Sequence, residues 1–315
     1  MYINAVGYYI PTKRINNEYF TQTNGLTDEW IHQRTGIRSR ARASEKETSE
    51  FMCFTAVKHA LPKLPYPIED VDLVVFASYT PTDTVATTGH IIQRVYNINL
   101  AKVFYVSSAC SSSINAIEII QSFFISGKAS KALLVCAEKN SSYSDDSDKI
   151  SGHLWGDGAV AYFFSRDRFS NEEIQVLDVT SQGLGHIGMG TQAITLNLKR
   201  GKLQMPIGRD VFLQACKYMA KSVKDITSKN GYVVSDLAYF IGHQANSRIL
   251  ENVIKQLNMP ENKTLSNIQE LGNTGSASTL LVLAQHYGQL KTGDLVCISV
   301  FGGGYSCGAC LLKKG

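Results

Sequence analysis

Short apolar runs alternate with amphipathic segments along most of this chain, and glycine, proline or polar residues separate them. Short runs rich in β-branched and aromatic residues are typical of buried strands, whereas apolar residues recurring every three or four positions predict helices. The pattern predicts strands at 2–10, 71–78, 103–106, 131–139, 155–165, 174–183, 237–244, 295–301 and 305–312. It predicts helices within 27–40 and at 47–61, 90–96, 114–124, 208–230, 246–256 and 275–287.

This alternation of strands and helices indicates a layered α/β architecture. A strand, a polar turn and a helix recur around Cys110 and again around His243. We therefore infer an internal duplication, with an N-terminal half at residues 1–168 and a C-terminal half at residues 169–315. A glycine-rich, weakly patterned insert at 183–205 belongs to the second half.

Composition narrows the class of protein. The 315 residues are 44% hydrophobic, which is enough for a substantial core in one large or two fused medium domains. The net charge of +4 comes from scattered lysines and arginines, so we expect no nucleic-acid surface. No apolar run reaches the roughly 18 residues that cross a bilayer, and the first residues lack the basic segment of a signal peptide.

Cysteine usage indicates a cytoplasmic protein. The seven cysteines are odd in number and irregularly spaced, which favours reduced thiols over a disulfide framework. No group of histidines and cysteines has the spacing of metal ligands, and we expect no metal.

One of these cysteines, Cys110, lies where a predicted strand gives way to a predicted helix. Unpaired backbone N–H groups and the helix dipole favour a thiolate at such a turn and hold an oxyanion. Cys110 is therefore a candidate nucleophile. The alternative is that it is a small buried hydrophobe, as most isolated cysteines are.

Three further turns offer complementary groups. His243 ends an apolar strand, Asn273 lies in a glycine-flanked turn before a helix, and Gly303 lies in the turn FGGGYS. A base-like imidazole, an amide donor and a backbone N–H thus all fall at turns where α/β folds place ligands. A lone histidine is more often structural, but the convergence of these groups indicates a catalytic site.

Trp30 and Arg34 lie four positions apart in the predicted helix that Thr27 caps. They project from one helical face, where an indole and a guanidinium frame a flat aromatic ligand and its phosphates. The other interpretation is an ordinary amphipathic edge.

Taken together, the motifs resemble those of the beta-ketoacyl-acyl-carrier-protein synthase III family in the thiolase superfamily. The segments DEWI with RTGIR, SSACSS, WGDGA, GHQAN, GNTGSAS and the terminal FGGG turn occur in the family's order and spacing. The resemblance runs from about residue 3 to residue 313. It implies a thiolase-like, five-layered α/β/α/β/α fold with internal pseudo-two-fold duplication, assembled as a homodimer.

The resemblance also implies a Cys-His-Asn triad at Cys110, His243 and Asn273. Such enzymes load an acyl primer on the cysteine and condense it with malonyl-acyl-carrier-protein in a decarboxylative Claisen reaction. The product is a beta-ketoacyl thioester, in fatty-acid initiation or a related pathway. Decarboxylation places negative charge on the thioester oxygen, which two fixed neutral donors stabilise. The backbone N–H groups of Cys110 and Gly303 form a second oxyanion hole.

The primer is expected on coenzyme A or on acyl carrier protein, and no permanently bound cofactor is implied. The resemblance assigns the coenzyme A channel to Trp30, Arg34, Lys149, Gly208, Phe212, Ala245 and Asn246. Lys149 replaces an arginine of the family, so the charge is kept but the planar stacking surface is lost.

Two departures concern carrier docking and substrate choice. Arg248 matches a carrier-docking residue of the family, whereas Leu213 replaces a docking lysine for which Lys217 is a substitute one helical turn away. Val85 stands where a phenylalanine of the partner subunit closes the acyl pocket, which predicts acceptance of medium or longer acyl chains. Such departures also occur in ketosynthase/cyclases that make dialkylresorcinols or cyclohexanediones, so this specialised role is an alternative.

Other members of the superfamily fit less well. A degradative thiolase would carry asparagine at His243, histidine at Asn273 and a catalytic cysteine where Phe301 begins the last glycine turn. An acyltransferase without condensation needs only the cysteine and the histidine, and Asn273 argues against it. A non-catalytic partner chain would usually have lost the cysteine or the histidine.

Overall fold

The computed structural model describes residues 1–197 and 202–315. Nine strands form one continuous sheet in the order β11-β12-β13-β8-β1-β7-β6-β4-β5. Their bounds are β1 Tyr2–Tyr9, β4 Leu73–Ala77, β5 Lys102–Val106, β6 Lys131–Lys139, β7 Asp157–Ser165, β8 Ile174–Gly183, β11 Tyr239–Gly242, β12 Leu295–Gly302 and β13 Ser306–Lys314. Two short pairs lie outside this sheet, β2 Arg14–Asn16 with β3 Ser39–Ala41, and β9 Thr195–Leu196 with β10 Leu203–Gln204.

The strand order repeats between the two halves of the chain. In the first half β4 is parallel to both β5 and β6, and β7 and β1 follow antiparallel. In the second half β11 is parallel to β12, and Phe240 of β11 forms a parallel bridge to Thr264. β12 then pairs antiparallel with β13, and β13 pairs antiparallel with β8. The bridge at Thr264 thus takes the place of β5. The predicted duplication is confirmed, and the domain boundary between residues 168 and 169 stays a prediction.

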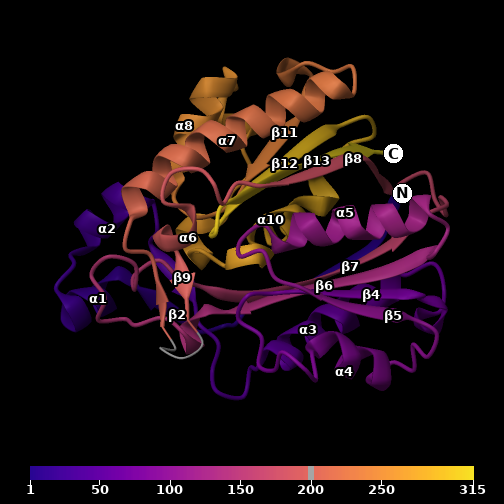
Figure 1. Cartoon of the computed structure of the whole chain (residues 1–315), viewed down its shortest axis with the longest axis horizontal. Coiled ribbons are helices and arrows are strands. Elements are labelled where there is room, and N and C mark those ends of the chain that lie inside the picture. The colour runs from indigo at the N-terminus through magenta and orange to yellow at the C-terminus, as the bar shows by residue number, and fades with distance from the viewer. Residues whose placement is uncertain (198–201) are drawn as a thin grey trace.

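Helices complete five layers, as Figure 1 shows. The outer layer of the first half holds α3 Ser49–Ala60 and α4 Thr88–Val95, and that of the second half holds α7 Gly208–Lys229 and α8 Ser247–Leu257. The central layer holds α5 Ser112–Ile125, which packs on β4 and β8, and α10 Ser278–His286, which packs on β7 and β11. The expected α/β/α/β/α fold is confirmed.

Burial explains why these segments take their places. β6 is buried over all residues between its two ends, since helices cover both faces of its sheet. Helix α5 buries Ile114, Ile117 and Ile120 in the core shared by both halves. A helix that lies between the two halves of the sheet needs apolar residues on more than one face, and α5 has them.

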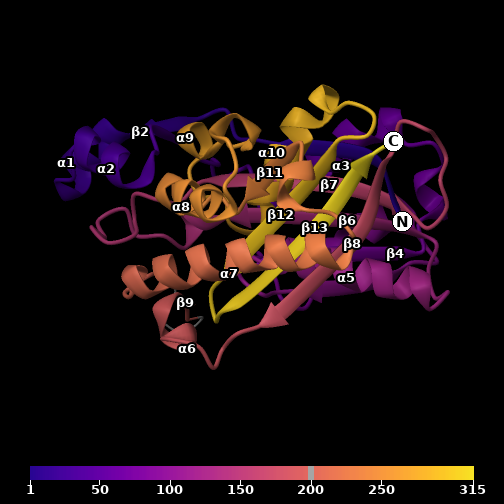
Figure 2. The same cartoon turned by 90° about the horizontal axis from the view of Figure 1, so that it is seen from above.

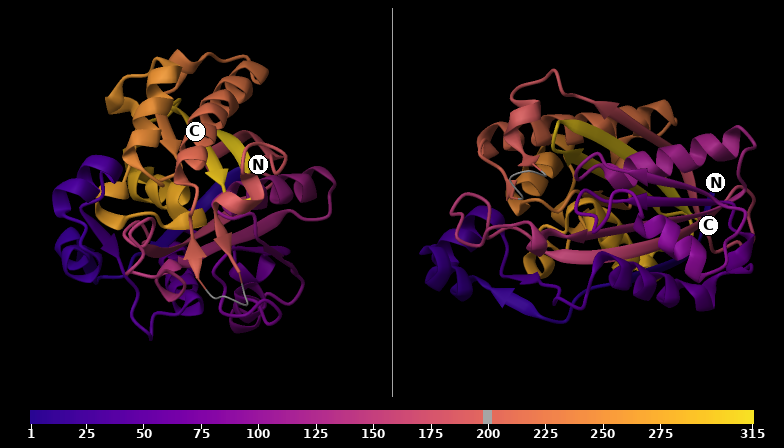
Figure 3. Two further views of the ribbon diagram at one scale, coloured as in Figure 1. Left: turned by 60° about the vertical axis from the view of Figure 1, so that its left-hand side comes forward. Right: turned by 60° about the horizontal axis from the view of Figure 1, so that its bottom comes forward.

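The remaining helices lie at one end of the molecule, where α1 Asn17–Asn24 and α2 Asp28–Thr35 pack together beside α8 (Figure 2). Helix α6 Gly190–Ala193 packs on α7, and α9 Ile268–Leu271 packs on β3. The two chain termini lie near each other at the opposite end (Figure 3). Within the described ranges, no helix has the length and apolar character needed to span a bilayer.

Three predictions need correction. The strand at 103–106 is not buried, because β5 pairs with a strand on one side only among the residues that the structure describes, and Phe104 is 39% exposed. The helix within 27–40 is capped by Thr27 as predicted but ends at Thr35, because Gly36 adopts the left-handed conformation with φ of 74°. The helix predicted at 275–287 begins as a 3-10 turn over Gly275–Ala277.

The insert at 183–205 has more structure than its weak pattern indicated, since it contains α6, β9 and β10. Residues 198–201 of this insert lie outside the described residues.

Candidate active site

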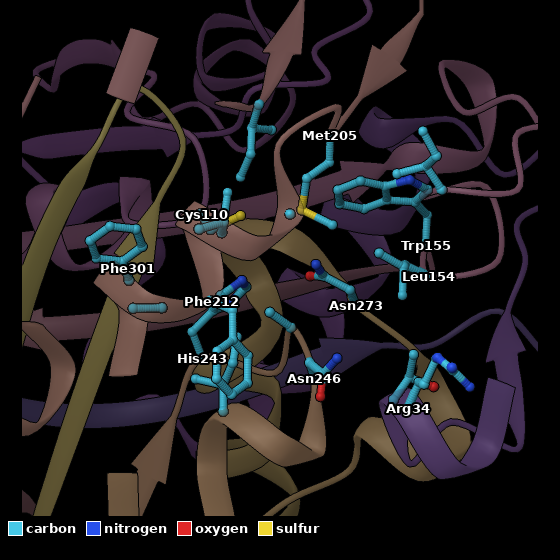
Figure 4. Close-up of a pocket in the computed structure, with 18 of the residues that line it drawn as sticks. Arg34, Cys110, Leu154, Trp155, Met205, Phe212, His243, Asn246, Asn273 and Phe301 are labelled. Carbon is cyan, nitrogen blue, oxygen red and sulfur yellow. The ribbon is translucent and has the colours of Figure 1, made fainter. Parts of the chain in front are cut away.

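The two central helices begin at the same place in the molecule, and the candidate catalytic residues lie at their N-terminal ends. Cys110 precedes α5, Asn273 precedes α10, and His243 directly follows β11. All three line one cavity of about 230 Å³. Figure 4 shows their side chains converging on one space, with Trp155 and Met205 along one wall. The duplication therefore brings Cys110 together with His243 and Asn273, which lie 133 and 163 positions further along the chain.

Serine side chains brace the turn that presents Cys110. Ala109 has φ of 48°, a left-handed conformation that costs a non-glycine residue about 1–2 kcal/mol. The Ser112 hydroxyl donates to the Ala109 carbonyl at 2.6 Å and accepts from the Ser108 N–H at 2.8 Å. The Ser111 hydroxyl donates to the Ser108 carbonyl at 2.7 Å. These bonds hold the strained turn in a single geometry.

The last glycine turn packs directly on this nucleophile turn. The hydroxyls of Ser111 and Ser306 are 2.5 Å apart, which joins the start of α5 to the start of β13. A Cβ added at Gly302 would lie 2.9 Å from the Ser111 nitrogen and 3.0 Å from the Cys110 nitrogen. Position 302 therefore needs glycine so that the two backbones can approach.

The thiol of Cys110 is almost completely enclosed, with 6% of the residue exposed. Burial, and after it the nearby Glu138 carboxylate, raises the pKa of Cys110 to about 12. A hydrogen bond from Tyr79 and the backbone N–H of Cys110 itself act in the opposite direction. The free protein therefore holds a thiol at neutral pH, and a thiolate depends on donors close to the sulfur.

The imidazole of His243 is held neutral and oriented by its neighbours. Burial lowers the pKa of His243 to about 4. Its Nδ1 lies 2.8 Å from the Ser278 hydroxyl, whose oxygen accepts from the Gln244 N–H at 3.4 Å. In the tautomer in which the Ser278 hydroxyl donates to Nδ1, Nε2 carries the ring proton and is the donor toward the cavity.

The amide of Asn273 is oriented in a similar way. Its Oδ1 accepts from the Gly275 N–H at 2.9 Å, so the NH₂ group is the end left for the cavity. The backbone of Asn273 is fixed by Leu154 and Gly156, at 2.8 and 2.9 Å. His243 and Asn273 therefore both present neutral N–H donors near Cys110, which suits stabilisation of a developing oxyanion.

The mouth of the cavity contains most of the residues predicted to bind coenzyme A. Trp30, Arg34, Gly208, Phe212, Ala245 and Asn246 line the cavity together with the three residues above. The Arg34 guanidinium lies 4.4 Å from the centre of the Trp30 ring and covers one face of it. Lys149 does not line the cavity, whereas Ile150 and His153 do.

A second cavity of about 280 Å³ extends from Cys110 on the other side and includes Gly303. Its walls contain the rings of Tyr79, Tyr105 and Trp155. Val85 lies outside both cavities of the single chain and is 85% exposed. The two predicted docking residues, Lys217 on α7 and Arg248 on α8, are exposed.

The sequence-based interpretation missed residues that orient the predicted ones. Ser278 fixes His243, and Asn140 donates to the carbonyl oxygens of Gly156 and Asn273 at 2.8 and 3.2 Å. Glu138 is fully buried, and burial raises its pKa to about 7. An acidic residue inside the apolar run KALLVCAEK was the one available signal, because a buried carboxylate needs specific partners.

Comparison with known proteins adds the family context. Residues 104–184 match the family described as 3-oxoacyl-[acyl-carrier-protein] synthase III, and residues 227–314 match its C-terminal part. The chain is 34% identical over 320 residues to the beta-ketoacyl-[acyl-carrier-protein] synthase III of Clostridium perfringens strain 13, covering 98% of this chain and 97% of that protein. It is 33% identical over 313 residues to the Aquifex aeolicus protein of the same name, covering 99% and 98%.

Solved structures agree with this match. The 3-oxoacyl-[acyl-carrier-protein] synthase III of Aquifex aeolicus superposes with a TM-score of 0.92 at 32% identity, covering 99% of both chains. The priming beta-ketosynthase of the R1128 polyketide pathway superposes with a TM-score of 0.90 at 28% identity, covering 99% of this chain and 96% of that one. Both similarities extend over essentially the whole fold.

Proposed function

We propose, since this chain belongs to the beta-ketoacyl-[acyl-carrier-protein] synthase III family, that Cys110, His243 and Asn273 carry out the family's condensation of an acyl primer with malonyl-acyl-carrier-protein. The chain is a ketosynthase, an enzyme of the acyltransferase class. The observation that carries the residue assignment is the single cavity in which a thiol meets two neutral N–H donors.

The first half-reaction loads the primer. The Cys110 sulfur attacks the carbonyl carbon of the acyl thioester, and the new S–C bond forms as the donor thiolate leaves. That thiolate departs as a thiol, with the proton that Cys110 gives up. Negative charge on the carbonyl oxygen is met by the backbone N–H groups of Cys110 and Gly303.

The second half-reaction forms the carbon–carbon bond. The malonyl group loses carbon dioxide, and the electrons of the broken C–C bond move onto the thioester oxygen as an enolate. His243 Nε2 and Asn273 Nδ2 donate to that oxygen. The enolate carbon attacks the acyl carbon on Cys110, the C–S bond breaks, and the Cys110 thiolate is released.

The residue roles are tested by separating the two half-reactions by intact-protein mass. Cys110→Ala should abolish the acyl adduct, whereas Cys53→Ala, a buried cysteine on α3, should load normally. Asn273→Ala should still load but discharge the adduct to malonyl-acyl-carrier-protein about 100-fold more slowly, as loss of an oxyanion donor does. Acyl loading of Cys110→Ala would overturn the assignment.

Coenzyme A thioester is the primer source we propose, with acyl carrier protein as the alternative donor. The support is the cavity whose walls include Trp30, Arg34 and Cys110, since a pantetheine arm has to reach the thiol through such a passage. Lys149 supplies charge near the channel mouth rather than a stacking surface. Loading rates from the same acyl group on coenzyme A and on carrier protein decide between the two donors.

Carrier protein is proposed to dock on the exposed basic residues near the mouth, Arg248 and Lys217. Carrier proteins that are acidic associate with such surfaces by electrostatic attraction. Arg248→Glu should raise the KM for malonyl-acyl-carrier-protein about ten-fold, with loading from a coenzyme A thioester unchanged. An equal effect on both substrates would contradict docking at this residue.

A homodimer is proposed on the grounds of the open sheet edge. β5 has no strand beyond it among the described residues, and Phe104 and Ile125 nearby are 39% and 80% exposed. An open, apolar edge strand favours pairing with a second copy. Light scattering during gel filtration should give twice the chain mass, and Phe104→Glu should give the monomer mass.

Val85 is proposed to serve the acyl cavity of the partner subunit, in keeping with its exposure and with its absence from the walls of both cavities of its own chain. A valine fills less space than an aromatic residue, so medium or longer acyl chains should load. A panel of straight-chain thioesters with adduct masses as the readout tests this, and a strict preference for acetyl would contradict it.

A priming role in polyketide or other specialised metabolism is the second candidate. It is favoured by the similarity to the R1128 priming ketosynthase and by the second cavity, whose walls contain Tyr79 and Tyr105. Product masses separate the candidates, since one condensation gives a linear beta-ketoacyl thioester and a following cyclisation gives a ring.

A further inference from the structure

Tyr79 lies beside the proposed nucleophile Cys110, in the second cavity, which also includes Gly303. It follows the end of β4 and lines the cavity together with Cys110, and its hydroxyl lies close enough to the Cys110 thiol to influence it. In the thiol form that hydroxyl donates to Asn140 Oδ1 at 2.8 Å. Tyr79 therefore places a polar O–H at the sulfur, in a cavity otherwise suited to an acyl chain.

The turn after Asn273 leaves the space that this phenol occupies. A Cβ added at Gly275 would come 2.4 Å from the Tyr79 hydroxyl oxygen and 2.8 Å from its Cε1. Gly275 also has φ of 58°, and its N–H donates to Asn273 Oδ1. The same glycine thus orients the Asn273 amide and admits the Tyr79 ring, so the two features are linked by one position.

The backbone beneath Tyr79 is fixed. Glu138 accepts the Tyr79 N–H at 3.2 Å and the Thr80 N–H at 3.1 Å. The same carboxylate accepts from the hydroxyl of Ser276, the residue after Gly275 in the second half of the chain. The phenol is therefore held by both halves of the chain, and its hydroxyl has little freedom other than rotation about the C–O bond.

The acceptor on the far side of the hydroxyl is fixed as well. Asn140 is fully buried, and its Nδ2 donates to the carbonyl oxygens of Gly156 and Asn273. These two bonds leave Oδ1 as the atom that faces Tyr79. The Tyr79 hydrogen thus has two acceptors within reach, the Asn140 amide oxygen and the Cys110 sulfur.

We propose that the Tyr79 hydroxyl is a further active-site group that rotates between Asn140 Oδ1, when Cys110 is a thiol or an acyl thioester, and the Cys110 sulfur, when it is a thiolate. The thiolate occurs twice per turnover, in the attack on the primer and on release of the beta-ketoacyl product. Tyr79 forms no covalent bond and gives up no proton. This inference rests on the proposed function, because it requires Cys110 to be the nucleophile.

Two properties of the site support a donor at this position. Burial raises the pKa of Cys110 to about 12, so a thiolate there gains more from a charge-assisted hydrogen bond than an exposed thiolate would. Burial and the nearby Cys110 raise the pKa of Tyr79 well above its usual value. The phenol therefore keeps its hydrogen over the working pH range and remains a donor.

The test compares Tyr79→Phe with Tyr66→Phe, using alkylation of Cys110 by iodoacetamide. Tyr66 is a buried tyrosine that lines neither cavity, and its hydroxyl donates to Asn4 Oδ1 at 3.0 Å, so it is the matched control. Both variants keep the ring. Alkylation is followed on the Cys110 peptide by mass across the alkaline pH range, because only the thiolate reacts.

We expect Tyr79→Phe to lower the alkylation rate and the rate of acyl loading at a given pH about ten-fold, the size of one charge-assisted hydrogen bond. The KM for the primer should stay unchanged, and Tyr66→Phe should match the wild type. Equal alkylation rates in all three proteins would overturn the inference. If Cys110→Ala still loads acyl groups, the proposed function fails instead, so the two failures are distinguishable.

Discussion

At the scale of single residues, the neutral imidazole of His243 is central to the proposed chemistry. Its folded-state pKa of about 4 lies below the ordinary value of 6.5. Between these values the unfolded chain binds a proton that the folded chain does not, so folding stability falls as pH decreases. The difference between these two pKa values corresponds to roughly 3 kcal/mol.

Replacement of His243 by glutamine should remove this pH dependence. Urea unfolding of the wild type should lose about 3 kcal/mol more than His243→Gln between pH 6.5 and 4, since the other titrating groups are common to both proteins. The His153 pKa is also lowered to about 4 and cancels in the difference. Parallel curves for the two proteins would show that His243 is not held neutral by the fold.

The residues named from the sequence and those missed differ in what determines them. Cys110, His243 and Asn273 each follow or precede a regular element, and a short local motif marks each one. Tyr79 has no local signal, because its role depends on Gly275, which is 196 positions away. A contact of that kind is set by tertiary packing and lies beyond pattern reasoning on one chain.

At the scale of elements, the close packing of the last glycine turn on the nucleophile turn gives a sharp prediction. Gly302→Ala places a methyl group 2.9–3.0 Å from backbone atoms of Ser108, Cys110 and Ser111. Since backbone cannot yield as a side chain does, we expect about 2–3 kcal/mol of lost stability and at least ten-fold slower acyl loading. Thermal unfolding and loading rates measure the two effects.

Gly183→Ala is the matched control, because a Cβ at Gly183 meets nothing within 4 Å and its φ is not positive. Gly183 is the last residue of β8 and pairs with Ser306, the first residue of β13 after the last glycine turn. This variant should load and melt like the wild type. A Gly302→Ala protein that behaves like Gly183→Ala would contradict the packing argument.

Element boundaries show where sequence patterns are sufficient. The strands predicted at 131–139 and 174–183 match β6 and β8 to the residue, because each is a complete run ended by polar or turn residues. β5 was predicted with the right position but the wrong burial. Its sequence KVFYV is as apolar as that of a central strand, and only the assembled sheet shows that it lies at an edge.

At the scale of the whole molecule, Glu138 joins the two halves at the site. Its carboxylate accepts from Ser78, Tyr79 and Thr80 in the first half and from Ser276 in the second. All of these groups are donors, so an amide in place of the carboxylate would direct its NH₂ group at some of them. A fully buried network of this kind is sensitive to the loss of one acceptor.

Glu138→Gln should therefore cost about 2–4 kcal/mol in urea unfolding above pH 7, where the carboxylate is ionised. It should also slow discharge of the acyl adduct, because Ser276 belongs to the turn that carries Asn273. Glu118→Gln is the control, since Glu118 is a partly exposed carboxylate that accepts from Ser181. Equal stability of the two variants would rule out a structural role for the network.

The central claim is that Cys110 carries the acyl group and passes it to malonyl-derived carbon in this cavity. The most direct measurement is a single-turnover mass experiment, in which the protein is loaded with an acyl-coenzyme A and then mixed with malonyl-acyl-carrier-protein. The account predicts one acyl adduct on the Cys110 peptide, which disappears as beta-ketoacyl-carrier-protein forms. An adduct on another residue, or an adduct that malonyl-acyl-carrier-protein leaves in place, would contradict it.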